Sequence, residues 1–406
     1  MTVKEFLQRK DTLLGLCFIA VIRILLILEQ NMPVFYVPLD GYCRAHYELS
    51  YDLAFMPRAL IGTLRTFAVE YVHPHTFYFC MFTLQVALCV GLIIFCYHCM
   101  KKTDFSTVSM WLFALLLFSP ILFFPFWDFG RFDVYLLMIA FVICLLLFNR
   151  KKLLASLVIL CLFPVGVMIH EVFLFLYAPL MIAWSFYQIE PRKALSYLPV
   201  TASVLGSVAA VCILYIMRQN MPSGNEIIVW LTANNNSDIA KAMIPYAGNE
   251  NEAMSYGTHF SEIWRNFFTW NWSRILTGGC FFLLSSLLPL YIIRQTFIQE
   301  KDRFAKCKIF VLAGGSLFPI LAGVIAYDFG RWYAASWFCL MLTAFFLLKE
   351  KKEMEYPVSP KMKTLLIWSI LLQIGAAGSI CCYHTLACII ELKLRHLKHL
   401  MIWLFT

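Results

Sequence analysis

Two short polar motifs recur two hundred residues apart in a chain that is otherwise strongly apolar. Residues 127–133 read WDFGRFD, and residues 328–332 read DFGRW. An arginine can bind a phosphate or a carboxylate through two parallel hydrogen bonds, and an aspartate can pair with that arginine or accept a proton. Because charge beside hydrocarbon is costly, the two motifs predict either an anion-binding site or a structural clamp.

Other side chains with similar chemistry stand beside or between apolar stretches. His170 and Glu171 are adjacent, and a zinc-binding HExxH motif is excluded because position 174 is Leu. The segment after the first apolar stretch carries four more charges: Asp40, Arg44, Asp52 and Arg58. Each has an ordinary alternative role, as a helix cap, a solvated loop charge or half of an ion pair. A functional site is therefore indicated only if these residues converge.

The composition places these residues in a polytopic membrane protein. Of 406 residues, 61% are hydrophobic and 14% are charged, and the mean hydropathy is +0.74. Soluble globular proteins are much less apolar and more highly charged. The net charge of +9 indicates basic cytoplasmic loops rather than nucleic-acid binding. Most of the 15 cysteines lie in apolar runs, where Cys acts as a small hydrophobic side chain.

Apolar segments long enough to cross a bilayer, for which about 20 residues are needed, recur along the whole chain. Eleven such segments lie near residues 12–30, 75–99, 106–126, 133–149, 152–169, 171–187, 195–217, 273–293, 309–327, 332–348 and 364–390. The expected fold class is therefore an all-α polytopic integral membrane protein with about 11 transmembrane helices (10 to 12), forming one domain over residues 1–406. The first apolar segment has no small-residue cleavage site of the kind found in signal peptides, so it is expected to remain as the first transmembrane helix.

The distribution of Lys and Arg predicts the orientation of these segments. With the N-terminus in the cytoplasm, the cytoplasmic connections hold 20 of these cations and the opposite face holds nine, in keeping with the positive-inside rule. Eight of the nine outer cations are Arg, whereas fifteen of the twenty inner ones are Lys. Arg matches phosphate and carboxylate geometry better than Lys does, so the outer face is expected to hold anions.

Two long loops are expected on that extracytoplasmic face. The first covers residues 31–74, and within it Pro57 predicts the start of a helix that lies along the membrane surface. The second covers residues 218–272 and ends in an aromatic run typical of a membrane interface. The C-terminal tail, residues 391–406, is expected to lie in the interface as well.

On this topology the candidate residues all fall on the outer face. A carboxylate that takes a proton from an acceptor hydroxyl, arginines that neutralise a leaving phosphate, and an apolar wall for a lipid tail would together support glycosyl transfer from a polyprenyl-linked sugar. Direct displacement at the anomeric carbon needs only a base and stabilisation of the leaving group. No metal and no cofactor are therefore expected.

The architecture resembles the GT-C superfamily of polyprenyl-phosphate-dependent glycosyltransferases. The resemblance rests on the long outer loop after the first helix, the early acidic residue Asp40, the surface-lying helix and the later outer-face charges. The Arg-rich face and the large second loop are also similar to bacterial polymerases and ligases that join lipid-linked surface-polysaccharide repeats of the O-antigen or capsule type.

This resemblance implies an enzyme of the bacterial inner membrane whose active site faces the periplasm or the outside. The donor would be a polyprenyl-(di)phosphate-linked sugar or oligosaccharide, the acceptor a glycan or lipid-linked glycan, and the partners other envelope polysaccharide assembly proteins. The base is assigned to Asp40, with Asp52 and Glu171 as further catalytic candidates. Substrate contacts are assigned to the remaining residues, which are Arg44, Arg58, Asp128, Arg131, Asp133, His170, Asp328 and Arg331. Polymerase and single-sugar transferase remain open alternatives.

A transporter or flippase of an anionic lipid-linked glycan is the main competing hypothesis. The two DFGR motifs each precede an apolar helix of the same expected orientation, as in a parallel internal repeat. Against this hypothesis, the charges fall on one face instead of at the bilayer midplane.

Overall fold

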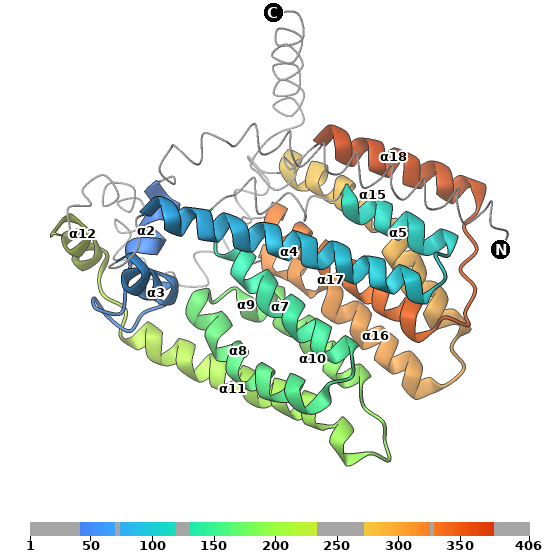
Figure 1. The fold of residues 1–406 in the computed structure, drawn as a ribbon, viewed down its shortest axis with the longest axis horizontal. Helices are drawn as coiled ribbons and strands as arrows, with labels where there is room; N and C mark the ends of the chain where they lie inside the picture. Colours follow the sequence, from blue (N-terminus) through green and yellow to red (C-terminus); the bar gives the residue numbers. More distant parts are fainter. Residues whose placement is uncertain (1–40, 70–73, 119–129, 234–271, 325–328, 377–406) are drawn as a thin grey trace, which may run out of the picture.

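The computed structural model describes residues 41–69, 74–118, 130–233, 272–324 and 329–376 (Figure 1). Across these ranges the protein is helical and has no β-sheet. The elements in chain order are α2 (Gly41–Glu48), α3 (Ala59–Val69), α4 (Pro74–Lys102), α5 (Thr107–Leu117), α7 (Asp133–Phe148), α8 (Lys152–Ile169), α9 (Phe173–Leu176), α10 (Ala178–Tyr187), η2 (Ala194–Ser196), α11 (Leu198–Gln219), α12 (Gly224–Ala233), α15 (Trp272–Gln299), α16 (Arg303–Leu317), η4 (Phe318–Val324), α17 (Phe329–Glu350) and α18 (Pro360–Ala376).

Six helical stretches in the described ranges are long and apolar enough to span a membrane. They are Cys80–Lys102, Lys152–Ile169, Ala194–Gln219, Gly279–Gln299, Arg303–Gly323 and Gly330–Glu350. Each coincides with one of the predicted apolar segments, so the all-helical, membrane-spanning class is confirmed at this level. Three further apolar helices, α5, α7 and α10, are shorter.

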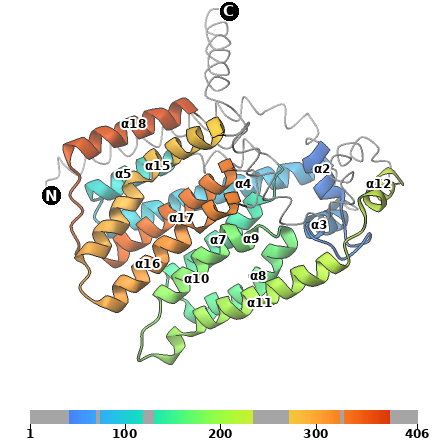
Figure 2. The same cartoon turned by 180° about the vertical axis from the view of Figure 1, so that it is seen from behind.

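Helix α17 forms the centre of the bundle, and α11 lies at its edge beside α8 (Figures 1 and 2). In the apolar stretch of α17, 89% of the residues are buried inside the protein, whereas in the apolar stretch that contains α11 only 28% of the residues are buried. The outward side of α11 presents Val204, Val208 and Val211, each more than half exposed. An apolar surface of this kind is stable against lipid tails, so the arrangement agrees with an integral membrane protein.

The bundle core contains a polar group that fixes how three helices pack. The Nε1–H of Trp184 on α10 donates to Thr343 Oγ1 on α17 across 3.3 Å, and Ser316 Oγ on α16 lies 2.8 Å from the same oxygen. The Trp184 ring also stacks on Phe346, with centroids 4.5 Å apart. All four side chains are completely buried. Within the described part of the chain the Trp184 N–H has no other hydrogen bond, so it depends on Thr343, whereas Ser316 Oγ also donates to the carbonyl oxygen of Leu312 at 2.8 Å.

Helices α7 and α17, which follow the two DFGR motifs, run parallel. At their first turns Arg331 of α17 bonds to Asp133 of α7, and at their last turns Lys349 Nζ donates to the carbonyl oxygen of Phe148 across 2.6 Å. We call the end with Asp133 and Arg331 the site end and the other end the opposite end. Helices α2, α3 and α12 also gather at the site end, on the left of Figure 1.

The opposite end is tied together by Lys and Arg from several connections. Arg150 and Lys152 flank the α7–α8 turn and pair with Glu350 at 2.5 Å and Glu190 at 2.8 Å, respectively. Lys351 pairs with Glu300 at 2.5 Å. The predicted cytoplasmic cations in these connections therefore lie at one end, and the described candidate site residues lie at the other.

The segment predicted as one span over residues 171–187 differs from the prediction. It consists of two short helices, α9 and α10, with a break at Tyr177, whose φ and ψ are −127° and −29°. Pro179 explains the break, because its ring removes a backbone donor and collides with the preceding turn of an α-helix. His170 and Glu171 consequently lie in the connection before α9 and not within a helix.

Two other boundaries differ from the expected ones. Helix α16 begins at Arg303 rather than near residue 309, because the Asp302 side chain caps it by accepting the Ala305 N–H at 2.7 Å. Helix α3 begins at Ala59 and not at Pro57, because Arg58 has a left-handed backbone with φ 68°. Outside the described residues lie span 12–30, the second half of span 106–126, span 364–390 beyond residue 376, and the tail 391–406.

Candidate functional site

The first turns of α7 and α17 bring one residue of each polar motif into contact. Arg331 donates from Nε and Nη2 to a single oxygen, Asp133 Oδ1, at 3.2 and 2.9 Å. Both side chains are about nine-tenths buried. Asp133 is the first residue of α7, where the partial positive charge of a helix N-terminus favours a carboxylate. The pair therefore joins two helices that are almost two hundred residues apart in sequence.

The turn before α7 depends on a glycine. Gly130 has φ 96°, a backbone conformation that side chains with a Cβ rarely adopt. This turn places Arg131 and Phe132 immediately before Asp133, and all three line one pocket. The glycine of the first motif is thus required by the local backbone.

The connection between α8 and α9 forms the second part of the site. The Arg58 guanidinium holds Glu171 with both ends of its fork, from Nε to Oε2 at 3.1 Å and from Nη2 to Oε1 at 2.6 Å. Arg218, at the end of α11, reaches the same carboxylate at 3.9 Å. Arg58 comes from the α2–α3 connection, so this ion pair holds the first-loop segment against the helices.

The charge state of Glu171 follows from its neighbours. Burial by itself raises the pKa of this carboxyl, but the positive charge of Arg58 outweighs burial and leaves the pKa well below its ordinary value. Glu171 is therefore ionised at neutral pH, and both of its oxygens accept hydrogen bonds from Arg58. A carboxylate held in this way is a weak proton acceptor.

His170 is neutral for a related reason. Burial lowers its pKa from the ordinary 6.5, and the positive charge of Arg58 lowers it further. Its Nδ1 accepts the backbone N–H of Val172 at 3.2 Å, although Glu171 Oε2 lies 3.3 Å from the same atom. The second contact would need a proton on Nδ1, which a neutral ring engaged by Val172 lacks. The proton therefore resides on Nε2, and His170 presents a hydrogen-bond donor there.

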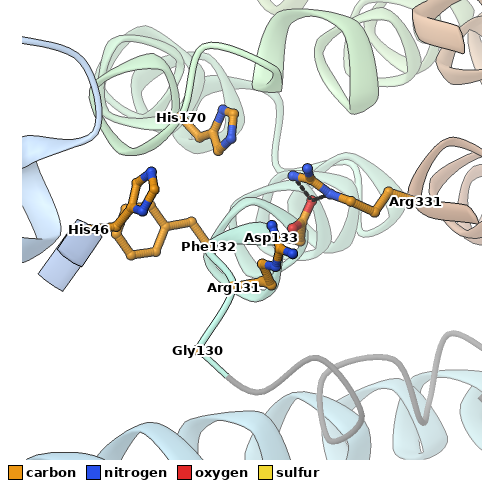
Figure 3. A pocket seen from close by; sticks show the side chains of 7 residues that line it. All are labelled: His46, Gly130, Arg131, Phe132, Asp133, His170 and Arg331. Carbon is orange, nitrogen blue, oxygen red and sulfur yellow. Dashed lines mark hydrogen bonds and ion pairs between the residues drawn. The ribbon is translucent and has the colours of Figure 1, made fainter. Parts of the chain in front are cut away.

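A small pocket connects the two parts of the site (Figure 3). Its cavity volume is about 20 Å³, enough for about one ordered water molecule or one small polar group. The lining side chains come from α2, the start of α7, the α8–α9 connection and α17: His46, Gly130, Arg131, Phe132, Asp133, His170 and Arg331. In Figure 3 the Asp133 carboxylate lies between Arg131 and Arg331, and the two histidines lie across from it. Four nitrogen-bearing side chains thus surround a space suited to an anion.

His46 is the pocket residue that sequence reasoning missed. Its Nε2 lies 3.3 Å from Arg58 Nη1, and because a guanidinium can only donate, Nε2 accepts this hydrogen bond. His46 thereby links the Arg58–Glu171 pair to the pocket. Its position two residues after Arg44 in the charged first loop was a usable signal.

The other predicted site residues are placed differently. Asp52 is exposed, lies outside the pocket and accepts a hydrogen bond from Ser50 at 2.9 Å. Arg44 belongs to α2, but its side chain is outside the described part of the chain, as are Asp40, Asp128 and Asp328. Of the predicted residues, the structure therefore brings together Arg58, Arg131, Asp133, His170, Glu171 and Arg331. Among the described residues, no three His, Cys, Asp or Glu side chains are placed to hold a metal ion.

A second, larger hollow lies at the opposite end. It has a volume of about 600 Å³ and is bordered by the α4–α5 connection and the segment after α17. Its lining carries charges of both signs, including Lys102, Asp104, Lys352 and Glu353. Unlike the pocket at the site end, it shows no preference for one charge.

Comparisons with known proteins do not assign this chain to a family. No protein-family model, curated protein or solved structure matches the chain at a significant level.

Proposed function

We propose that this chain is a membrane-embedded glycosyltransferase that uses a polyprenyl-(di)phosphate-linked donor at the extracytoplasmic face. The observation that carries the proposal is the small pocket at the site end, which is lined by two arginines and two histidines: Arg131, Arg331, His46 and His170. A GT-C-like architecture with about 11 spans and a cytoplasmic N-terminus belongs to the same proposal. Five of its predicted outer cations have described contacts at the same end as the pocket: Arg58, Arg65, Arg131, Arg218 and Arg331.

The chemistry of the pocket suits a phosphate that becomes more negative as the bond to the sugar breaks. Donors that are already fixed in position stabilise such developing charge without rearranging in the transition state. Arg331 is fixed by Asp133, and the neutral His170 offers its Nε2–H. The apolar outer surfaces of the helices can accommodate a polyprenyl tail in the bilayer while the phosphate reaches the end of the bundle.

Binding of the lipid phosphate can be measured on the purified protein. We expect undecaprenyl phosphate to raise its melting temperature in detergent, and undecaprenol, which has the same tail, to have no such effect. Arg131→Gln should weaken this binding by about tenfold or more, since a charge-assisted hydrogen bond contributes about 1.5–3 kcal/mol. Arg192→Gln, an exposed change at the opposite end, is the matched control. Equal stabilisation by undecaprenol and undecaprenyl phosphate would refute the anion site.

Transfer activity needs a separate test in the native strain. Deleting the gene should stop extension of a surface glycan, and the lipid-linked precursor should accumulate on the outer leaflet. In the alternative, the chain is a flippase of an anionic lipid-linked glycan, and the precursor should accumulate on the inner leaflet. Two observations are typical of a transporter and favour this alternative. Helices α7 and α17 form a parallel pair, and polar hollows lie at both ends of the bundle.

A further inference from the structure

We propose that Asp133 is the residue that accepts the proton of the acceptor hydroxyl. This assignment rests on the proposed glycosyl transfer and differs from the sequence-based one, which gave the proton to Asp40 and used Asp133 only for substrate contact. It makes Asp133 a catalytic residue of the pocket. Three features support it: the other described carboxylates near the site are engaged or distant, one Asp133 oxygen has no hydrogen bond, and that side chain lines the pocket.

Three other carboxylates at the site end, among those that the structure describes, are poorly placed to take a proton. Both oxygens of Glu171 are held by Arg58. Glu48 pairs with Arg65. Asp52 is exposed, bonds to Ser50 and does not line the pocket.

Asp133 is held differently from these residues. Both hydrogen bonds that Arg331 donates to Asp133 fall on Oδ1, and the buried Oδ2 has no hydrogen-bond partner. The residue is 5% exposed. A buried carboxylate oxygen without a donor is destabilising, and such atoms are uncommon in folded proteins and call for an explanation. A hydroxyl group of a bound acceptor would supply the missing donor.

The surroundings of Asp133 also suit the reaction. Arg131 lies on one side of the carboxylate and Arg331 on the other (Figure 3), so a phosphate held by the pocket cations would lie close to Oδ2. A base and a leaving group must lie on the two sides of one anomeric carbon. The pocket provides cationic donors and a carboxylate within the same small space.

The proposed step is balanced without a co-reactant. The oxygen of the acceptor hydroxyl forms a bond to the anomeric carbon of the donor, and its proton moves to Asp133 Oδ2. The bond between the anomeric carbon and the phosphate oxygen breaks, and its electron pair leaves with the polyprenyl phosphate or diphosphate. The pocket cations stabilise the charge of that leaving group. When the products leave, water that enters the vacated space takes the proton from Asp133 Oδ2 and restores the site.

The test separates proton transfer from lipid binding. Asp133→Asn keeps a side-chain oxygen for Arg331 but removes the base. We expect it to bind undecaprenyl phosphate within about threefold of the wild type and to lower glycan extension in the complemented deletion strain by about 100-fold or more. Glu226→Gln is the matched control, because this exposed carboxylate at the same end caps α12 and lies outside the pocket. It should extend glycan normally.

A second variant covers the case in which Asp133→Asn does not fold. Exchanging the two charges, Asp133→Arg with Arg331→Asp, preserves a possible ion pair but moves the carboxylate to α17. Glycan extension by this double variant would show that the pair is only a clamp and would overturn the proposal. So would extension by folded Asp133→Asn within tenfold of the wild type.

Lipid binding and glycan extension together distinguish a base from a residue that only binds lipid. If Asp133→Asn loses undecaprenyl phosphate binding together with extension, Asp133 serves lipid binding and the proposal is wrong. If wild-type protein fails to bind undecaprenyl phosphate, or the deletion strain makes normal glycan, the proposed function itself fails. Loss of extension with lipid binding retained, in Asp133→Asn and not in Glu226→Gln, supports the assignment.

Discussion

The Arg58–Glu171 ion pair should stabilise the protein measurably, because it holds the first-loop segment against the helices. Breaking the pair should therefore lower the free energy of unfolding. The perturbation is a double-mutant cycle of Arg58→Ala and Glu171→Gln. Both partners are partly buried, with side-chain exposures of 29% and 20%, and they share two hydrogen bonds. We expect a coupling free energy of about 2 kcal/mol, between the values for exposed pairs and for fully buried ones.

The backbone of Arg58 provides an internal check on this magnitude. Its φ of 68° is unfavourable for a residue with a Cβ, by about 1 kcal/mol relative to glycine. Arg58→Gly and Arg58→Ala remove the same guanidinium but differ in this backbone strain. Arg58→Gly should therefore be the more stable of the two by about 1 kcal/mol.

The assay is SDS titration in mixed micelles, followed by tryptophan fluorescence. Lys193→Ala with Glu190→Gln serves as the control cycle, because this pair is solvent-exposed at the opposite end and should show no resolvable coupling. A coupling below about 0.5 kcal/mol for Arg58 and Glu171 would refute the tether. Greater stability of Arg58→Ala than of Arg58→Gly would refute the account of the backbone.

Two further predictions concern stability. The His170 pKa is lowered in the folded state, so the stability that depends on its neutral form is fully present above pH 6.5 and is lost as the pH falls. His170→Asn should therefore reduce the slope of the SDS-unfolding free energy against pH, between pH 7 and 5, by up to about 1.4 kcal/mol per pH unit. An unchanged slope would contradict this account. At Gly62 an added Cβ would lie 1.8 Å from the carbonyl oxygen of Leu49, whereas at Gly314 nothing lies within 4 Å. Gly62→Ala should therefore lower the SDS-unfolding free energy by about 2 kcal/mol and Gly314→Ala should not. Equal effects of the two changes would show that α3 does not pack closely against the backbone at Leu49.

The sequence predicted the helices better than it predicted their interruptions. Apolar length identified all six spans because burial in lipid requires it at each span independently of the rest of the fold. The break at Tyr177 was not predicted, although Pro179 was a usable signal. The early start of α16 was missed because Arg303 and its neighbouring cations read as a loop, whereas Asp302 caps a helix that includes them.

The site was predicted as a set of residues, without its contacts. Charge at the ends of apolar segments pointed to Arg131, Arg331 and Glu171, since such charge is retained only when it is useful or paired. The partners could not be predicted, because Asp133 pairs with a residue 198 positions away and Glu171 with one 113 positions away. On charge alone, Arg331 and Arg58 could each have paired with any carboxylate of the outer face. Their actual partners are determined by how α17 lies relative to α7 and how the first loop lies relative to α8.

The structural and functional interpretations of the DFGR motifs are compatible. As a clamp, Arg331 uses Nε and Nη2 on one oxygen of Asp133 and fixes the starts of α7 and α17. Because both bonds fall on Oδ1, the clamp leaves Oδ2 without a donor, and because the pair is buried, that oxygen cannot be satisfied by bulk water. Arg58 likewise commits two donors to Glu171. The same ion pairs that hold the site end together therefore hold its cationic side chains in fixed positions, which is the condition for stabilising a leaving phosphate.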